Sequence, residues 1–382
     1  MKPEVSQGGF TAVFLFPMTW RPLKRSFAGR FELLSQVCRG YIFTTCGPTY
    51  RKLQIGNFYL YSQKVTSNPI GRSLGRFWVQ TIFPVFLLWR KREIDAIIAY
   101  DPYASGVAGS ILKRFLKAKL IVEINGDFHR FTPGENIFKK WLMNLAFHFS
   151  LRNADAVKVL NKDQETFFME NYPEKPLYRF SDYVATDYFI SLNTYRGDYL
   201  LSIGYPFYIK GMDILIQAFG SISKFHPKVK LKIMGYCTED ELLSHRQLVG
   251  SNSNVEFVSP GWIEEVGEQL RGCYAYVSAS RWEAMGKVIL EAMACRKPVV
   301  STRTNGGVDY VDEGRTGLLS EIENVDDLAK KMDYLLSHPD EAERMGEAGL
   351  KRVEQEYSEE KYVLRFLDML EEIVHSKNEA FS

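Results

Sequence analysis

Short apolar runs alternate with longer amphipathic runs along the whole chain, and this alternation predicts the order of its strands and helices. In the first half, the apolar runs predict strands at residues 11–17, 40–45, 94–99, 120–124 and 156–160. Patterns with the helical period lie between them and predict helices at residues 27–38, 106–116, 137–150 and 162–171. Strands that alternate with helices in this way are typical of a parallel, doubly wound sheet.

The second half repeats the pattern, with strands predicted at residues 199–203, 230–234, 255–258, 275–278 and 298–301. Helices are predicted at residues 211–225, 239–250, 266–271, 287–295, 326–337, 340–357 and 359–375. Residues 178–197 are aromatic and polar without a clear period, so we place the link between two domains there. A chain of 382 residues is long enough for two cores, which we assign to residues 1–185 and 186–358.

The segment with the clearest chemistry is 274–317, which the pattern divides into a strand, a polar loop, a helix, a strand and a glycine-rich loop. Gly286 comes just before the helix, where free backbone N–H groups and the positive end of the helix dipole suit a phosphate. Glu291, inside the helix, can accept hydrogen bonds from the two adjacent hydroxyls of a ribose. Glu283, on the loop, can reach a sugar beyond the phosphates. The alternative is that both glutamates are ordinary solvated residues.

This segment resembles the signature of the large retaining glycosyltransferase family numbered four, whose architecture of two Rossmann-like domains is called GT-B. The family motif is a Glu, seven residues, and a second Glu followed by Ala-Met-Ala, which here are Glu283 and residues 291–294. The other matches are a Pro-Val-Val strand, a Gly-Gly pair and a nucleotide-sugar loop, at residues 298–300, 306–307 and 204–211. The resemblance covers most of residues 150–370 and is thin before them.

The resemblance implies a GT-B fold in which the last stretch, residues 359–382, returns to the first domain. It also implies that Lys210 neutralises the donor diphosphate and that Glu291 binds the ribose hydroxyls, while Glu283 contacts the transferred sugar or the phosphates. Further positions are implied around the diphosphate and on the floor of the donor site, and these are Gly204, Gly286, Lys287, Val288, Gly306 and Gly307.

One departure from the family concerns the charge at the donor diphosphate. The family has an Arg directly after the glycine of the first strand of this domain, where this chain has Tyr205, which carries no positive charge. Three nearby cations are candidates to compensate for the missing Arg, namely Arg281, Lys287 and Arg303.

A second departure concerns the first domain. The family often has a His-Gly pair after a strand, and this chain has Asn125 and Gly126. Asn125 can form a hydrogen bond with a sugar hydroxyl but cannot shuttle a proton at neutral pH. Asp127, the next residue, is either a carboxylate on the catalytic side or a turn residue.

These features predict a retaining glycosyltransferase that moves a sugar from a UDP- or GDP-sugar donor to a hydroxyl acceptor. We expect the acceptor to be lipid-linked or a cell-surface glycan precursor, as in polysaccharide biosynthesis. The sequence contains no Asp-x-Asp motif and no cluster with metal-ligand spacing, so we expect metal-independent transfer without a further cofactor. The alternatives are a catalytically weak paralogue that binds a nucleotide sugar, and a GT-B epimerase or hydrolase of nucleotide sugars.

The net charge of +2 conceals an uneven distribution. Residues 1–190 hold 26 Lys and Arg against 15 Asp and Glu, whereas the remainder holds 22 against 31. A domain this basic favours an anionic partner, and no nucleic-acid-binding motif is present, so we expect an anionic membrane surface or acceptor. Three basic residues in the loop after the first strand are candidates to meet an acceptor phosphate, namely Arg21, Lys24 and Arg25.

Residues 72–92 combine basic and aromatic side chains, a pattern that suits a bilayer interface or a helix buried on the sheet. No apolar run reaches the roughly 18–20 residues that span a bilayer, and the first residues lack an apolar signal-peptide core. The five cysteines show no metal or disulfide spacing, as expected for free thiols in a reducing compartment. We therefore expect a cytoplasmic protein that is peripheral on the inner face of the membrane.

Overall fold

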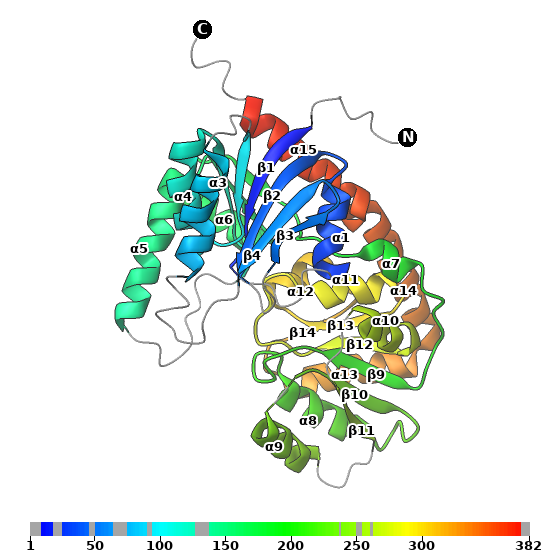
Figure 1. The fold of residues 1–382 in the computed structure, drawn as a ribbon. Helices are drawn as coiled ribbons and strands as arrows, with labels where there is room; N and C mark the ends of the chain where they lie inside the picture. Colours follow the sequence, from blue (N-terminus) through cyan, green and yellow to red (C-terminus); the bar gives the residue numbers. More distant parts are fainter. Residues whose placement is uncertain are drawn as a thin grey trace. The chain divides into compact units, whose positions relative to one another are not determined.

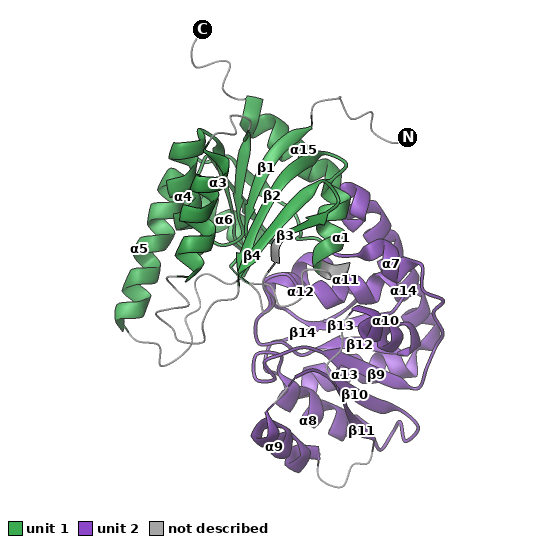
Figure 2. Ribbon diagram, viewed as in Figure 1, with its two compact units in different colours: residues 1–183, 362–382 green, residues 184–361 purple. Residues whose placement is uncertain are grey.

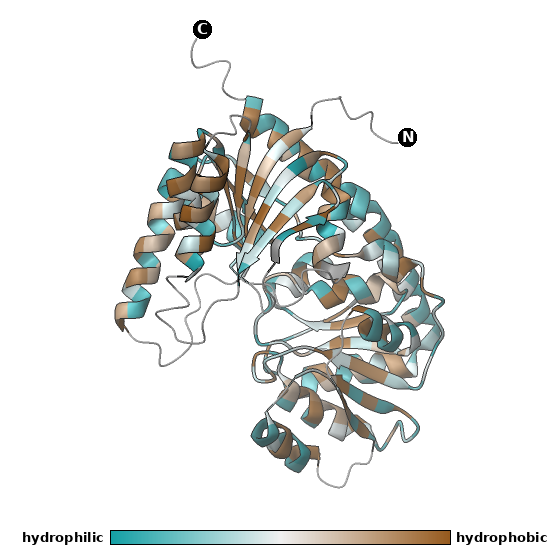
Figure 3. Ribbon diagram, viewed as in Figure 1, coloured by the Kyte–Doolittle hydropathy of each residue, from teal (hydrophilic) through white to brown (hydrophobic). Residues whose placement is uncertain are grey.

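The structure is a computed structural model that describes residues 9–17, 25–45, 50–63, 75–89, 94–126, 137–236, 238–249, 254–259 and 263–375. The chain divides into two compact units, residues 1–183 with 362–382 and residues 184–361 (Figure 2). Each unit is built on one sheet flanked by helices (Figure 1). Apolar residues concentrate along the strands of both sheets (Figure 3), as expected for parallel sheets covered on both faces.

The sheet of the first unit has eight strands in the order β3-β4-β2-β1-β5-β6-β7-β8. All of them except β3 run parallel: β1 Phe10–Leu15, β2 Cys38–Thr45, β4 Phe58–Gln63, β5 Ala96–Ala99, β6 Lys119–Glu123, β7 Ala156–Val159 and β8 Leu177–Arg179. At one edge, β3 (Tyr50–Ile55) and β4 (Phe58–Gln63) form an antiparallel hairpin that the sequence analysis did not predict. The reason is that β3 mixes basic, polar and apolar residues and has no continuous apolar run.

Two helical layers cover this sheet. On one face, α4 (Ala104–Leu116) packs against α5 (Ile137–Asn153) and against two consecutive helices, η1 (Trp78–Ile82) and α3 (Phe83–Leu88). α6 (Lys162–Asn171) connects β7 to β8. On the other face, the ring of Phe14 in β1 packs against Phe31 of α1 (Arg25–Leu34) and Phe366 of α15 (Glu359–His375). The C-terminal helix therefore completes the core of the first unit.

The second unit has six parallel strands in the order β11-β10-β9-β12-β13-β14. The strands are β9 Tyr199–Ile203, β10 Lys230–Met234, β11 Val255–Val258, β12 Ala275–Ser278, β13 Val299–Thr302 and β14 Gly317–Ser320. β14 was not predicted, because only its two central residues, Leu318 and Leu319, are large and apolar. The predicted fold class, two doubly wound Rossmann-like units, is confirmed.

The helices of the second unit follow its strands in the order typical of this fold. They are α7 Thr186–Ile190, α8 Met212–Ile222, α9 Glu239–Val249, α10 Ile263–Gly272, α11 Lys287–Ala294, α12 Asn305–Tyr310, α13 Val325–Ser337, α14 Pro339–Arg352 and η2 Val353–Tyr357. Within the described residues, no helix of either unit has the length and apolar character needed to cross a membrane.

Phe14 should be one of the side chains on which the first unit depends, because it is fully buried and contacts Phe31, Phe58 and Phe366. We expect Phe14→Ala to lower the free energy of unfolding by about 3–5 kcal/mol, through lost burial and the cavity left behind. Phe115→Ala, a matched change at an exposed position of α4, should alter it by well under 1 kcal/mol. Urea denaturation of both variants measures the difference, and equal midpoints would contradict this account of the core.

Candidate functional site

The candidate site lies at the carboxyl edge of the six-stranded sheet, where loops follow the central strands. Gly204 comes directly after β9 and Gly235 directly after β10. The two loops touch, because a Cβ added at Gly235 would lie 2.2 Å from the carbonyl oxygen of Gly204. In open α/β sheets this edge is the usual place for a ligand.

Lys210 and Glu283 form an ion pair at this edge. Lys210 stands just before α8, and its methylene chain lies so close to Gly204 that a Cβ there would be 2.7–2.8 Å from it. Its ammonium donates a hydrogen bond to the carboxylate of Glu283, on the loop after β12. Each side chain is only 20% exposed. The structure therefore brings together two predicted site residues that are 73 positions apart.

The amino terminus of α11 lies next to Glu283. Gly286 is its N-cap, with a left-handed φ of +70° that favours glycine and with no side chain to cap the helix. Gly306 packs against it from the first turn of α12, where the sequence predicted a loop, since a Cβ at Gly306 would lie 2.4 Å from the carbonyl oxygen of Met285. The N–H of Gly306 also donates to the carbonyl of Glu283, at 2.9 Å. This packing keeps bulk away from the start of α11.

The other predicted glycine and backbone positions lie in the same two helices. Lys287 and Val288 begin α11 and are half-buried. Gly307 lies in the first turn of α12, and its N–H donates to the hydroxyl of the N-cap residue Thr304, at 3.2 Å. Helix starts leave backbone N–H groups without intrahelical acceptors, so the first turn of α11 can bind an anion.

Glu291 is a buried carboxylate one turn further along α11. It is 7% exposed, and no hydrogen bond to its carboxylate is found among the described residues. Burial raises its pKa from the ordinary 4.5 to about 7, and the charge of Lys287 opposes that rise only in part. A carboxylate without partners in such a place can accept hydrogen bonds from a ligand that enters the site.

Two predicted compensating cations have structural partners. The guanidinium of Arg281 makes two hydrogen bonds to Asp213, at 2.9 and 2.7 Å, and a further one to Glu323. It also donates to the carbonyl of Tyr208, so it fastens the loop before α8 to the loop after β12. Arg303 pairs with two carboxylates, those of Glu313 and Glu321. Among the described residues, the side chain of Lys210 lies against Gly204, and Lys287 stands at the start of α11, where its charge acts on Glu291.

An aromatic pair that the sequence analysis did not find lies beside the two edge glycines. The rings of Tyr205 and Tyr236 meet edge to face with centroids 5.5 Å apart, and both side chains are exposed. Only Tyr205 was noted, as a departure from the family. Tyr236 gives no signal in the sequence, because its place beside Tyr205 depends on the pairing of β9 with β10.

In the first unit, Asn125 lies at the carboxyl edge of the eight-stranded sheet, over a buried cluster of charges. Its amide donates to the carboxylate of Glu123 and to the carbonyl of Tyr100, both at 3.1 Å. Its Oδ1 atom is buried and accepts no hydrogen bond from the part of the chain that the structure describes. Glu123 is held in turn by Arg30 at 2.8 Å and faces Lys158 at 3.6 Å.

Sequence reasoning missed Arg30 and Glu123, although a charged residue inside an apolar strand such as β6 is a usable signal. Asp127, the other predicted residue of this edge, lies outside the described residues, as do Arg21 and Lys24. No group of three or more His, Cys, Asp or Glu side chains that could hold a metal ion was found among the residues described.

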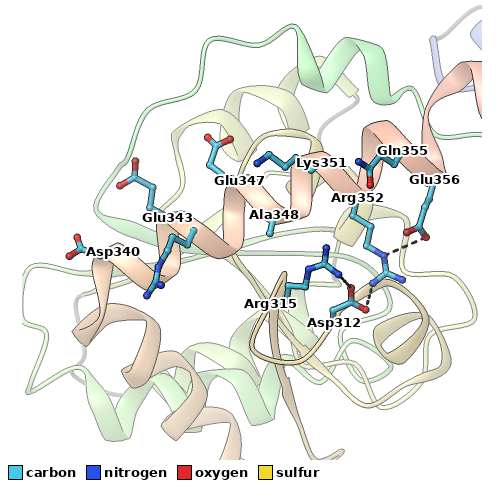
Figure 4. Close-up of a pocket in the computed structure, with 11 residues that line it drawn as sticks. Asp312, Arg315, Asp340, Glu343, Glu347, Ala348, Lys351, Arg352, Gln355 and Glu356 are labelled. Carbon is cyan, nitrogen blue, oxygen red and sulfur yellow. Dashed lines mark hydrogen bonds and ion pairs between the residues drawn. The ribbon is translucent and has the colours of Figure 1, made fainter.

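A separate groove of about 690 Å³ runs along α14 in the second unit (Figure 4). Its charged side chains pair with one another, as Arg352 does with Asp312 at 2.7 Å and with Glu356 at 3.6 Å. None of the predicted site residues lines it. We therefore take its charges to stabilise the join between α14 and the loop after α12.

The known proteins that this chain resembles include several glycosyltransferases. The family model described as Glycosyl transferases group 1 matches residues 189–352. An uncharacterized glycosyltransferase of Methanocaldococcus jannaschii is 29% identical over 292 residues, which are 73% of this chain and 76% of that protein. The capsular polysaccharide biosynthesis glycosyltransferase CapM of Staphylococcus aureus is 28% identical over 149 residues, 39% of each chain. The chain thus spans much less than two thirds of CapM.

Solved structures share the fold of the whole chain. A glycosyltransferase from Rickettsia africae has a TM-score of 0.72 and 17% identity, over 96% of this chain and 99% of that chain. HepE of Anabaena, in complex with UDP and glucose, has a TM-score of 0.71 and 16% identity, over 94% and 99%. At this identity the likeness concerns the fold alone, and with these neighbours the predicted GT-B fold class is confirmed.

The raised pKa of Glu291 gives a prediction about stability. A carboxyl that binds its proton more tightly when folded stabilises the protein at low pH, and this advantage is lost as the pH rises from about 4.5 through about 7. At about pH 8 we expect Glu291→Gln to raise the free energy of unfolding by roughly 3 kcal/mol, with most of the gain absent near pH 5.

Thermal unfolding at both pH values, without nucleotide, measures this effect. Glu264→Gln, at an exposed position of α10, is the matched control and should change neither melting temperature. A gain for Glu291→Gln that is the same at both pH values would mean that burial does not raise the pKa of Glu291.

Proposed function

Because residues 189–352 match the family model of the glycosyl transferases of group 1, we propose that this chain transfers a sugar from a nucleotide-diphosphate donor to a hydroxyl acceptor with retention at the anomeric carbon. The donor is a UDP- or GDP-sugar. The observation that carries the proposal is the gathering of Lys210, Glu283, the start of α11 and Glu291 at one sheet edge. HepE, a neighbour in fold, was solved with UDP-glucose, which supports a donor of this class.

In this proposal the donor diphosphate lies between Lys210 and the first turn of α11. Lys210 supplies a positive charge, and the backbone N–H groups of Gly286, Lys287 and Val288 donate hydrogen bonds. The ribose places two hydroxyls against Glu291, which favours its ionised form. The diphosphate competes with Glu283 for Lys210, and this leaves Glu283 free to contact the transferred sugar.

The reaction that fits these groups is attack on the face from which the leaving group departs. The acceptor hydroxyl oxygen forms the new bond to the anomeric carbon as the bond to the diphosphate oxygen breaks. The leaving phosphate oxygen takes the acceptor proton, so no separate base is needed. Lys210 and the helix N–H groups stabilise the negative charge that develops on the diphosphate. In the first unit, we assign Asn125 to the acceptor side, because its Oδ1 atom accepts no hydrogen bond from the described residues.

We further infer that the acceptor is anionic and carried on the inner face of the membrane, as a lipid-linked or cell-surface glycan precursor. The basic first half of the chain supports this, since residues 1–92 have a net charge of +12. Relatives named for capsular polysaccharide and lipopolysaccharide core biosynthesis support the same class of acceptor.

The alternative is a paralogue that binds a nucleotide sugar with little turnover. Tyr205 and Asn125 favour it, because each replaces a charged or titratable residue of the family. The two functions differ in whether the sugar leaves the donor.

A nucleotide panel followed by product analysis tests the proposal. We expect either UDP or GDP, at about 100 times its dissociation constant, to add about 2.7 kcal/mol of stability in a thermal-shift assay. With the matching nucleotide sugar and a lipid-linked acceptor, NMR of the product should show the anomeric configuration of the donor. Nucleotide binding without transfer would favour the paralogue, an inverted product would contradict retention, and no nucleotide binding would refute the donor site.

The rate of transfer should depend more strongly on Lys210 here than in family members that have both an Arg and a Lys at the diphosphate. We expect Lys210→Ala to lower kcat/KM for transfer by about 100-fold or more, since it removes the cation that faces the leaving group. Lys228→Ala, an exposed change in the same unit, serves as control and should leave the rate unchanged. If Lys210→Ala keeps most of its kcat/KM while remaining folded, the diphosphate is held elsewhere.

A further inference from the structure

The outer face of α5 is an exposed apolar surface. Six large apolar side chains recur along it three and four residues apart, each between 41% and 84% exposed: Ile137, Phe138, Trp141, Leu142, Leu145 and Phe149. That spacing places them on one side of the helix. The rings of Phe138 and Trp141 stack with centroids 5.8 Å apart, so the surface is continuous at its amino end.

This surface is not needed to attach α5 to its unit. The side that packs on the domain carries the buried residues Phe147, Ser150 and Leu151. The hydroxyl of Ser150 donates to the carbonyl of Pro102, at 2.5 Å, close to the start of α4. α5 therefore has two apolar sides, of which one is already buried. Contiguous apolar surface on the outside of a helix indicates a site of interaction.

A second stripe of the same kind lies in the same helix layer. Along η1 and α3, five large apolar residues are exposed by 42–87%: Phe77, Trp78, Ile82, Phe86 and Trp89. Val79, Gln80 and Leu88, on the other side of these helices, are buried. Both stripes belong to helices that pack against α4 (Figure 1), and brown segments recur along both in Figure 3.

The charged residues of these helices indicate which kind of partner binds the exposed apolar surface. Within the sequence of η1, α3, α4 and α5, together with the helical residues 75–77, there is no Asp or Glu. The same segments contain Arg76, Lys113, Arg114, Lys139, Lys140 and Arg152, of which Lys113 pairs with Asp155 at 2.6 Å. Aromatic and aliphatic side chains interleaved with basic ones, and with no acidic ones, match the boundary between anionic headgroups and acyl chains. A second copy would bring two surfaces of equal positive charge together, which is unfavourable.

We propose that the outer face of α5, together with the stripe on η1 and α3, docks on an anionic lipid bilayer with its apolar side chains inserted. This deepens the proposed function, because it names the surface through which the enzyme reaches a membrane-borne acceptor. The insertion distinguishes it from attraction by charge alone. Binding through inserted side chains persists at high salt, where charge-only attachment is screened within about 3 Å at 1 M.

Vesicle co-sedimentation with the full chain tests the proposal. Vesicles of phosphatidylcholine with phosphatidylglycerol are compared with vesicles of phosphatidylcholine alone, at low and high salt. We expect the wild type to bind the anionic vesicles and to retain measurable binding at high salt. The double variant Trp141→Glu/Leu142→Glu should bind about tenfold more weakly or worse, because it places two charges at the acyl boundary.

Met169→Glu is the matched control, since Met169 is 62% exposed on α6 in the same unit and belongs to neither stripe. It should bind vesicles as the wild type does. Analytical ultracentrifugation without lipid should give a monomer for all three proteins. Thermal shift with UDP and GDP should be the same for all three, which separates this proposal from the donor site.

Three results would overturn the proposal. One is no wild-type binding to anionic vesicles at low salt. Another is equal loss of binding in Met169→Glu and in the α5 double variant. The third is a wild-type dimer that the double variant dissociates, because the surface would then be an interface between two copies. In each case, retained nucleotide binding would leave the donor site unaffected.

Discussion

The ion pair between Lys210 and Glu283 is the interaction on which the candidate site depends. It joins the loop before α8 to the loop before α11, so the cation and the start of the anion-binding helix are held at one edge. Two glycines leave room for the pair, because neither has a side chain. Gly204 lies against the methylene chain of Lys210, and Gly306 packs against the backbone just before Gly286. Each of the two side chains satisfies the other in this structure. In the proposed function, the donor diphosphate takes the place of the carboxylate beside Lys210.

Both sheets carry buried charged groups at their carboxyl edges. The two edges differ in whether these groups pair with other charged residues of the same unit. In the first unit, Arg30 pairs with both Glu123 and Asp182, and Lys158 faces Glu123, so two cations meet two carboxylates beneath Asn125. Buried pairs of this kind contribute little net stability but are strongly destabilising when one partner is removed. In the second unit, the carboxylate of Glu291 is buried and has no hydrogen-bond partner among the described residues, and burial raises its pKa. The charges of the first edge are thus balanced by other residues of its own unit, whereas in the proposed function the second edge is completed by the donor.

The outer face of α5 in the first unit is likewise a feature that the fold of its own unit does not require. A surface helix needs one apolar side to pack on its own domain. α5 has a second apolar side, and this side is exposed. The proposed sugar transfer does not itself require an exposed apolar side on α5. If the acceptor is held at a bilayer, as we propose, the enzyme must bind the anionic membrane surface without spanning it, and an exposed apolar side then serves that binding.

The sequence by itself determined the fold class and pointed to residues 274–317 as the candidate donor segment. Buried parallel strands need continuous apolar runs, and the Glu283, Gly286 and Glu291 pattern is local, so both can be recognised without a structure. Tertiary structure alone decided which distant groups meet. It pairs Lys210 with Glu283, occupies Arg281 with Asp213, and sets Tyr236 beside Tyr205, since these contacts depend on strand order. It also decided which side of α5 faces outward, because helical periodicity cannot distinguish two sides that are both apolar.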